Sequence, residues 1–157
     1  MDTSYKNRKS PRLKDYDYRE QGAYFVTICA HQRHHHFGDI QNGIFTPTPL
    51  GKIAHTCCEQ IPVHYPHVDL DEFIIMPNHV HFILVIHLAG KTPLGTIVGS
   101  YKAAVTRQAN ASNILYDGKI WQERYHDRII RNENEYLTIK AYIIDNPLRW
   151  QDDTFYS

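Results

Sequence analysis

The chain has 157 residues, the length of one compact domain. Its 17 basic and 17 acidic residues give a formal net charge of zero, which argues against a histone-like binder or an acidic disordered chain. Three cysteines are too few for a disulfide framework and indicate a reducing, cytoplasmic location. The sequence has no apolar run long enough for a membrane span and no apolar N-terminal signal, so we expect no membrane association.

The neutral total conceals a segregation of charge along the sequence. Residues 1–14 hold five basic residues and one acidic residue, whereas residues 100–131 hold six basic and three acidic residues. These stretches are either two solvated faces or, if the fold brings them together, one phosphate-binding surface. We predict a basic N-terminal arm over residues 1–20 and a single domain over residues 21–157.

The first half of the domain combines a strand, a hairpin and a helix. Residues Ala23–Ala30 are rich in β-branched and aromatic side chains, which predicts a strand, and a histidine-rich turn follows. Within Phe37–Phe45, an Asn-Gly pair between short apolar runs predicts a β-hairpin. Apolar residues at helical spacing over Leu50–Ile61 predict an amphipathic helix that the next proline stops.

The second half begins with two strands, Val68–Met76 and His79–Ile86, which a tight Pro-Asn turn joins into an antiparallel pair. Helical periodicity predicts helices over Leu94–Ala109 and over Glu133 to about Asp145, the second ending before a proline. Between these helices, Tyr125–Ile130 is extended. The order of elements predicts an α+β, ferredoxin-like split βαβ fold with a central antiparallel sheet, an added hairpin and a C-terminal helix. The pattern does not give the strand order.

Two histidines at alternate positions, His79 and His81, lie inside the second strand of the predicted pair. Alternate residues of a strand share one face, so the two imidazoles lie side by side and offer half of a metal site. An isolated pair of this kind is more commonly two core histidines bonded to backbone groups. The hypothesis of a metal site therefore needs a second group of ligands.

The last predicted helix offers such a group, because Tyr142 and Asn146 are four residues apart and share one helix face. Asn146 presents an amide oxygen at the helix C-terminus, where the helix dipole favours a cation. Tyr142 could act as a nucleophile beside it, although taken alone it is typical of a packing tyrosine. Tyr125 is a rival nucleophile in a basic stretch, and Tyr101 fits a core position.

The sequence resembles the HUH single-tyrosine transposase family, and within it the bacterial REP-associated tyrosine transposases. The similarity runs from about Tyr24 to Trp150. It rests on four motifs in the family's order: Met76-Pro77-Asn78-His79-Val80-His81, Trp121-Gln122, Tyr125-His126-Asp127-Arg128-Ile129-Ile130-Arg131, and Tyr142-x-x-x-Asn146-Pro147.

This resemblance implies a DNA transposase or nickase that cleaves and rejoins single-stranded, hairpin-bearing DNA. Tyr142 is then the nucleophile that forms a 5′-phosphotyrosine, while His79, His81 and Asn146 hold a divalent metal, Mg or Mn. The candidate nucleic-acid contacts are Arg8, Arg12, Lys14, Lys102, Arg107, Arg124, Arg128 and Arg131.

Three points stay open at this level. The enzyme could be a monomer or a homodimer that shares or swaps the tyrosine helix. A domesticated protein could bind hairpin DNA without catalysis. A metal hydrolase of another substrate class would need a water-activating carboxylate, and none is adjacent to the histidines in the sequence. The histidines at 34–36 are more typical of a solvated loop than of a metal site.

Overall fold

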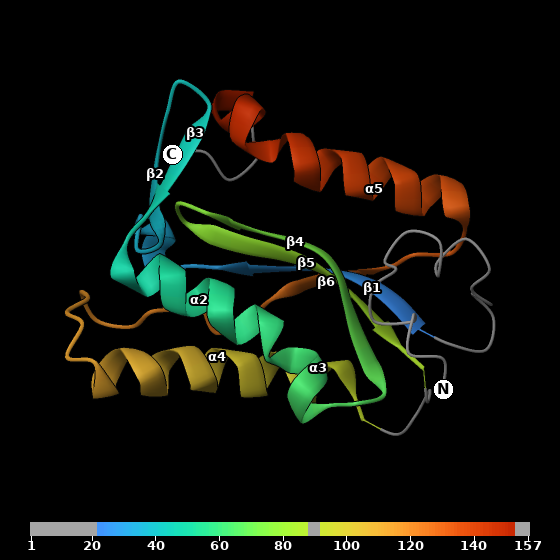
Figure 1. Ribbon diagram of the computed structural model, residues 1–157, viewed down its shortest axis with the longest axis horizontal. Helices are drawn as coiled ribbons and strands as arrows, with labels where there is room; N and C mark the ends of the chain where they lie inside the picture. The colour runs from blue at the N-terminus through green and yellow to red at the C-terminus, as the bar shows by residue number, and fades with distance from the viewer. Residues whose placement is uncertain (1–21, 88–91, 153–157) are drawn as a thin grey trace.

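A four-stranded antiparallel sheet forms the centre of the computed structural model, which describes residues 22–87 and 92–152 (Figure 1). The predicted N-terminal arm lies outside these residues. The strands are β1 (Gly22–Cys29), β4 (Val68–Met76), β5 (His79–Ile86) and β6 (His126–Ile129). Their order, β4-β5-β1-β6, is that of a ferredoxin-like split βαβ fold. The predicted fold class is therefore confirmed, and the structure adds the strand order.

A separate hairpin consists of β2 (Gly38–Gln41) and β3 (Ile44–Pro47), and it follows a short helical turn, η2 (His31–Arg33). The two residues at its tip, Asn42 and Gly43, have φ angles of 54° and 76°. Both lie in the left-handed region, as the tight turn of a two-residue hairpin requires. The Asn-Gly signal in the sequence thus predicted this element correctly.

Helices cover both faces of the sheet (Figure 1). One face carries α2 (Pro49–Glu59), α3 (Ile61–His64) and α4 (Leu94–Ala111), and the other carries α5 (Glu133–Asp145), which continues into η3 (Asn146–Asp152). None of the described helices is both long and apolar enough to cross a membrane.

The start of α2 is set by a cap and a close backbone contact. The Thr48 hydroxyl accepts a hydrogen bond from the Gly51 amide at 3.0 Å, and a proline occupies the first turn. A Cβ atom at Gly51 would lie 1.9 Å from the Phe37 carbonyl oxygen, so only glycine fits there. Helix α2 confirms the helix predicted over Leu50–Ile61, although it ends at Glu59. The sequence analysis did not predict α3, which begins at Ile61 and has Pro62 in its first turn.

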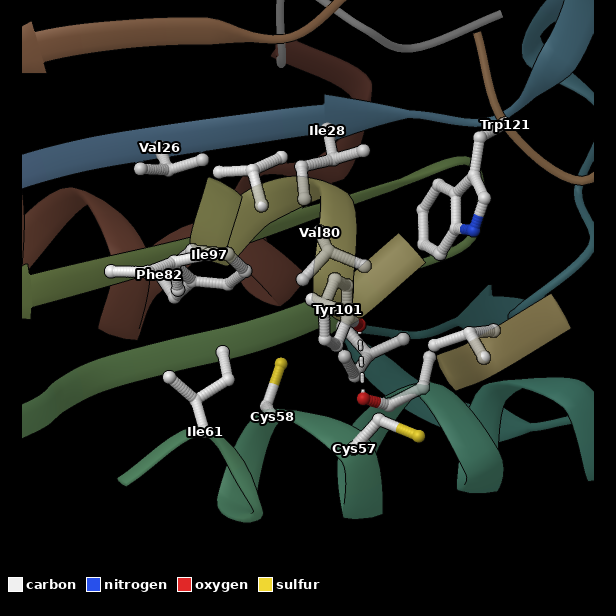
Figure 2. Packing of buried hydrophobic residues seen from close by; sticks show 14 of the residues in the cluster. Val26, Ile28, Cys57, Cys58, Ile61, Val80, Phe82, Ile97, Tyr101 and Trp121 are labelled. Atoms are coloured by element: carbon white, nitrogen blue, oxygen red, sulfur yellow. Dashed lines mark hydrogen bonds between the residues drawn. The ribbon is translucent and has the colours of Figure 1, made fainter. Parts of the chain in front are cut away.

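All eight residues of strand β5 are buried, because helices cover the sheet on both faces. Val80 and Phe82 point into the larger core cluster with Val26, Ile97 and Tyr101 (Figure 2). The alternate positions of β5 belong to the face under α5, where its apolar residues Ile83 and Val85 pack in a smaller cluster. His79 and His81 share this second parity, so the sequence of β5 directs both imidazoles toward α5.

Candidate active site

His79 and His81 begin β5 with their ring centroids 4.6 Å apart, and their side chains are 0% and 1% exposed. Nδ1 of His79 lies 2.8 Å from Oδ1 of Asn78 in the preceding turn. Nδ1 of His81 lies 2.8 Å from Oγ1 of Thr27, which is directly opposite it on β1. Each ring is thus oriented through Nδ1, and Nε2 is the ring atom that could coordinate a metal.

Burial keeps both rings neutral. It lowers the pKa of His81 to about 3, and it lowers the pKa of His79 well below its ordinary value, with smaller contributions from His81 and Arg33. A carbonyl oxygen can only accept, so the bond to Asn78 places the proton of His79 on Nδ1 and the lone pair on Nε2. Neutral imidazole is the form that binds metals.

Two hydrogen bonds from backbone amides to side chains cap the start of helix α5. Oδ1 of Asn132 accepts a hydrogen bond from the Glu135 amide at 2.9 Å, and Oε1 of Glu135 accepts one from the Arg131 amide at 2.8 Å. From there the helix buries Tyr136, Ile139 and Ile143 against the sheet. This spacing places residue 142 at the border of the buried stripe, between core and solvent.

Tyr142 lies beside the histidine pair. Its ring centroid is 5.4 Å from that of His81 at an interplanar angle of 65°, and Phe25 contacts it edge-on at 6.2 Å. The side chain is 38% exposed, so one part faces the histidines and another faces solvent. One turn later, Nδ2 of Asn146 donates to the Tyr142 carbonyl at 3.3 Å. Oδ1 of Asn146 is buried, and no described residue donates a hydrogen bond to it.

Trp150, in η3, packs against the histidine pair. Its ring stacks on that of His79 at 6.1 Å with an interplanar angle of 27°, and it also contacts His35 at 5.8 Å. Along the chain, Asn146 falls between Tyr142, which contacts the ring of His81, and Trp150, which contacts the ring of His79. The structure brings the sequence-predicted His79, His81 and Tyr142 together within one chain, with Asn146 on the segment that joins the two contacts.

Sequence reasoning did not identify the residues that support this site. Asn78 was assigned to a turn and to the first family motif but given no role of its own, although it directly precedes His79. Thr27 and Phe25 reach the site through the β1–β5 and sheet–helix contacts, which a single sequence does not reveal. Trp150 follows the predicted helix and carried no motif of its own beyond marking the end of the resemblance.

The structure does not place all the predicted DNA contacts on one surface. Arg128 pairs with Phe25 across β6 and β1 and so shares the face of the histidines. Arg107 lies on α4, on the opposite face, where it lines a cleft with His64. Lys102, also on α4, donates to the carbonyl oxygens of residues 122 and 123 at 2.7 and 3.1 Å, which gives it a structural task.

The remaining candidates are placed as follows. Arg124 and Arg131 are exposed on either side of β6. Arg8, Arg12 and Lys14 lie outside the described residues. The rival nucleophile Tyr125 packs near Gly95 at the start of α4, across the sheet from the histidines. Tyr101 is buried and donates to the Ala54 carbonyl at 3.0 Å, which confirms it as a core residue.

The histidine-rich turn does not form a metal centre with neighbouring acids or thiols. His34 contacts both His31 and His36 edge-on, at 6.2 and 5.3 Å between ring centroids. Over residues 22–87 and 92–152, no group of three or more His, Cys, Asp or Glu side chains is arranged to hold a metal. This criterion does not cover the candidate active site, because the third potential donor there is the amide of Asn146.

Comparison with known proteins identifies the family. The model of the IS200-like transposases matches residues 20–146, which is most of the chain. The protein belongs to the IS200-like transposase family. It is 39% identical over 170 residues to an uncharacterised protein of Haemophilus influenzae, with 96% of this chain and 93% of that relative covered. The family resemblance inferred from the sequence is thereby confirmed.

Two solved structures share the fold. A REP-associated tyrosine transposase bound to a REP hairpin has a TM-score of 0.64 and 19% identity, over 86% of this chain and 72% of that one. A candidate transposase of Deinococcus radiodurans R1 has a TM-score of 0.57 and 19% identity, over 85% of this chain and 95% of that one. At such identity the likeness establishes a common fold.

Proposed function

We propose that this member of the family cleaves and rejoins single-stranded DNA with Tyr142 as the nucleophile. The observation that carries the proposal is the contact between the Tyr142 and His81 rings at 5.4 Å, on a helix that leaves the tyrosine 38% exposed. A nucleophile needs both access for its substrate and a neighbouring site for the reacting group. The position of Tyr142 between solvent and the histidine pair supplies both.

In the proposed reaction the Tyr142 hydroxyl loses its proton, and its oxygen attacks the scissile phosphorus. The new bond joins Tyr142 to the 5′-phosphate. The bond from phosphorus to the 3′ oxygen breaks, and that oxygen leaves and takes up a proton. Because the phosphotyrosine is itself an ester, a 3′-hydroxyl can attack it and rejoin a strand without ATP. A phenol, with a pKa of about 10, is a suitable leaving group for this return step.

We propose that His79, His81 and Asn146 hold a divalent cation, Mg²⁺ or Mn²⁺. The donor types fit such an ion, because the three residues offer two neutral imidazoles and one buried amide oxygen to which no described residue donates a hydrogen bond. When bound, the cation would polarise the scissile phosphate. Imidazole donors suit Mn²⁺ better than Mg²⁺, so we expect tighter binding of Mn²⁺.

The proposed substrate is single-stranded DNA that carries a hairpin. The structural relative is likewise bound to a hairpin, the REP hairpin. Arg128 lies on the histidine face of the sheet, and Arg131 is exposed between β6 and α5. Their charge would position the phosphate backbone without reading its sequence. The predicted contacts of Arg8, Arg12 and Lys14 remain part of this proposal.

The experiment combines labelled hairpin oligonucleotides with Mn²⁺ or Mg²⁺ and detects covalent protein–DNA adducts on a denaturing gel. The wild-type protein and Tyr125→Phe should form the adduct, whereas Tyr142→Phe should not, and EDTA should prevent it. His79→Ala and His81→Ala should lose most of the adduct but still bind DNA, and the matched control His64→Ala, on α3, should keep both properties.

An adduct in Tyr142→Phe, or an equal yield in EDTA, would contradict the proposal. Hairpin binding with no cleavage under any divalent ion would favour the alternative that the protein binds hairpin DNA without catalysis.

A further inference from the structure

A groove of about 760 Å³ lies between the β2–β3 hairpin and the segment that follows η2. This volume is within the range of roughly 300–1,000 Å³ that is typical of small-ligand sites. Its lining includes the polar side chains of His35, Asp39, Gln41, Asn42 and Thr46, together with Ile44, which is 69% exposed. The reaction proposed above uses none of these residues.

The register of the hairpin explains why these side chains face outward together. Asp39 pairs with Thr46, and Gln41 pairs with Ile44, so these four share one face of the hairpin. Phe45, at the alternate position, packs against the larger core cluster on the other face. The tight turn at the tip fixes both strands, so the groove is formed before any ligand arrives.

The groove lies next to the proposed active site. The ring of His35, in its wall, is 5.8 Å from the ring of Trp150, which in turn stacks on His79. At the tip of the hairpin, Cδ2 of Leu148 lies 2.8 Å from the position that a Cβ of Gly43 would take. The hairpin therefore contacts η3, and Figure 1 shows it beside the C-terminal end of α5.

The chemistry of the lining favours a base over a phosphate. Among the described lining residues, Asp39 is the only acidic residue, and no lysine or arginine is present. A carboxylate repels phosphate but accepts hydrogen bonds from the amino groups of bases. Nε2 of Gln41 donates to Oδ2 of Asp39 at 3.3 Å and helps to orient that carboxylate. The exposed imidazole of His35 offers a surface on which a base can stack.

We infer that this groove binds an unpaired nucleobase with an exocyclic amino group, close to the scissile phosphate. Adenine, cytosine and guanine carry such a group, and thymine does not. The inference rests on the proposed function, and it adds a subsite that selects the unpaired bases next to the cleavage position.

The test uses Tyr142→Phe protein in EDTA, so that neither cleavage nor metal contributes. Fluorescence anisotropy measures binding of one DNA hairpin whose unpaired flanks are all dA, all dC or all dT. We expect the dA and dC flanks to bind about fivefold or more tightly than dT. Adding Asp39→Ala should reduce both to the dT affinity, while adding Glu59→Ala, an exposed carboxylate on α2, should preserve the preference. Circular dichroism checks that each variant is folded.

Equal affinities for the three flanks, no measurable binding, or a preference that survives Asp39→Ala would overturn the inference. The outcome can be separated from that of the proposed function with wild-type protein and Mn²⁺. Adduct formation with equal affinity for all flanks would reject the subsite alone. A flank preference that depends on Asp39, without any adduct, would reject the reaction alone.

Discussion

The Tyr136 hydroxyl donates a 2.8 Å hydrogen bond to Oδ2 of Asp71, and both side chains are buried. Tyr136 lies in the first half of α5, whereas Asp71 lies in β4 at an irregularity of the edge strand. One turn further along α5, Nζ of Lys140 is 3.8 Å from the carboxylate of Glu72. These polar links fix the helix over the sheet, and they thereby fix where Tyr142 meets the histidines.

Replacing Tyr136 with Phe should destabilise the protein by about 1–3 kcal/mol. The substitution keeps the ring but removes the donor, and it leaves the buried Asp71 carboxyl without this hydrogen bond. Urea unfolding followed by circular dichroism measures the change. Tyr116→Phe is the matched control, because its hydroxyl bonds to Asn110 at an exposed position, and it should shift the free energy by no more than about 0.5 kcal/mol. Equal shifts for the two variants would show that the buried bond contributes nothing specific.

The Asp71 carboxyl should also make stability depend on pH. Burial raises its pKa above the ordinary value, and the hydrogen bond from Tyr136 only partly opposes this effect. The folded state therefore holds the proton more tightly than the unfolded state does, so stability falls as pH rises from about 4 through the raised pKa. Asp71→Asn cannot ionise, and its stability relative to wild type should improve across that interval. Urea unfolding at a series of pH values measures the difference, and a constant difference would contradict this account.

Much of the fold could be predicted because its local signals agree with its tertiary structure. The strands Val68–Met76 and His79–Ile86 and the helix Glu133–Asp145 have the predicted bounds, since a turn, a cap or a proline marks each end. The order of strands needed the structure, because pairing partners are distant in sequence. The division of α2 from α3 was missed for a local reason, since Pro62 can start a helical turn as well as end one.

The candidate site divides in the same way. The two-residue period of a strand predicted that His79 and His81 share one face. The period of a helix predicted the same for Tyr142 and Asn146. The contact between the two pairs depends on how α5 packs, which the smaller core cluster and the polar links of Tyr136 and Lys140 decide, rather than either motif. Thr27 illustrates the limit, since only the β1–β5 register shows that it faces His81.

Thr27→Val should weaken metal binding at the candidate site by about 10- to 100-fold. When Nε2 of His81 binds a metal, Nδ1 carries the proton and donates a hydrogen bond to the Thr27 hydroxyl. Valine keeps the shape of threonine but cannot accept this hydrogen bond. Isothermal titration with Mn²⁺ measures the affinity directly and does not depend on DNA cleavage.

The control for this variant is Thr56→Val, an exposed threonine on α2, which should bind Mn²⁺ like the wild type. If a folded Thr27→Val protein bound Mn²⁺ with unchanged affinity, the Thr27 hydroxyl would not be needed to orient His81.

Two glycine-to-alanine substitutions should change stability in opposite directions. At Gly51 the new methyl would overlap the Phe37 carbonyl oxygen, so α2 would have to move and stability should fall by about 1–3 kcal/mol or more. At Gly99, inside α4, the added Cβ would have no described atom within 4 Å apart from its chain neighbours and the nearby backbone of its own helix. Alanine there should stabilise by about 0.5–1 kcal/mol. Urea unfolding measures both, and a stable Gly51→Ala would show that the close approach to Phe37 is readily relieved.

Mixing two impaired variants tests whether one chain builds the whole active site. Tyr142→Phe lacks the proposed nucleophile and should form no DNA adduct, whereas His81→Ala lacks a proposed ligand and should keep only a small residue of adduct formation. If Tyr142 acts beside His81 of its own chain, as their 5.4 Å ring contact favours, the mixture should form no more adduct than the two variants do separately. A homodimer that exchanges the tyrosine helix would instead create one intact site in each mixed pair and restore the adduct. Unfolding and refolding the variants together before the assay ensures that chains can exchange, and adduct recovery under those conditions would contradict assembly within one chain.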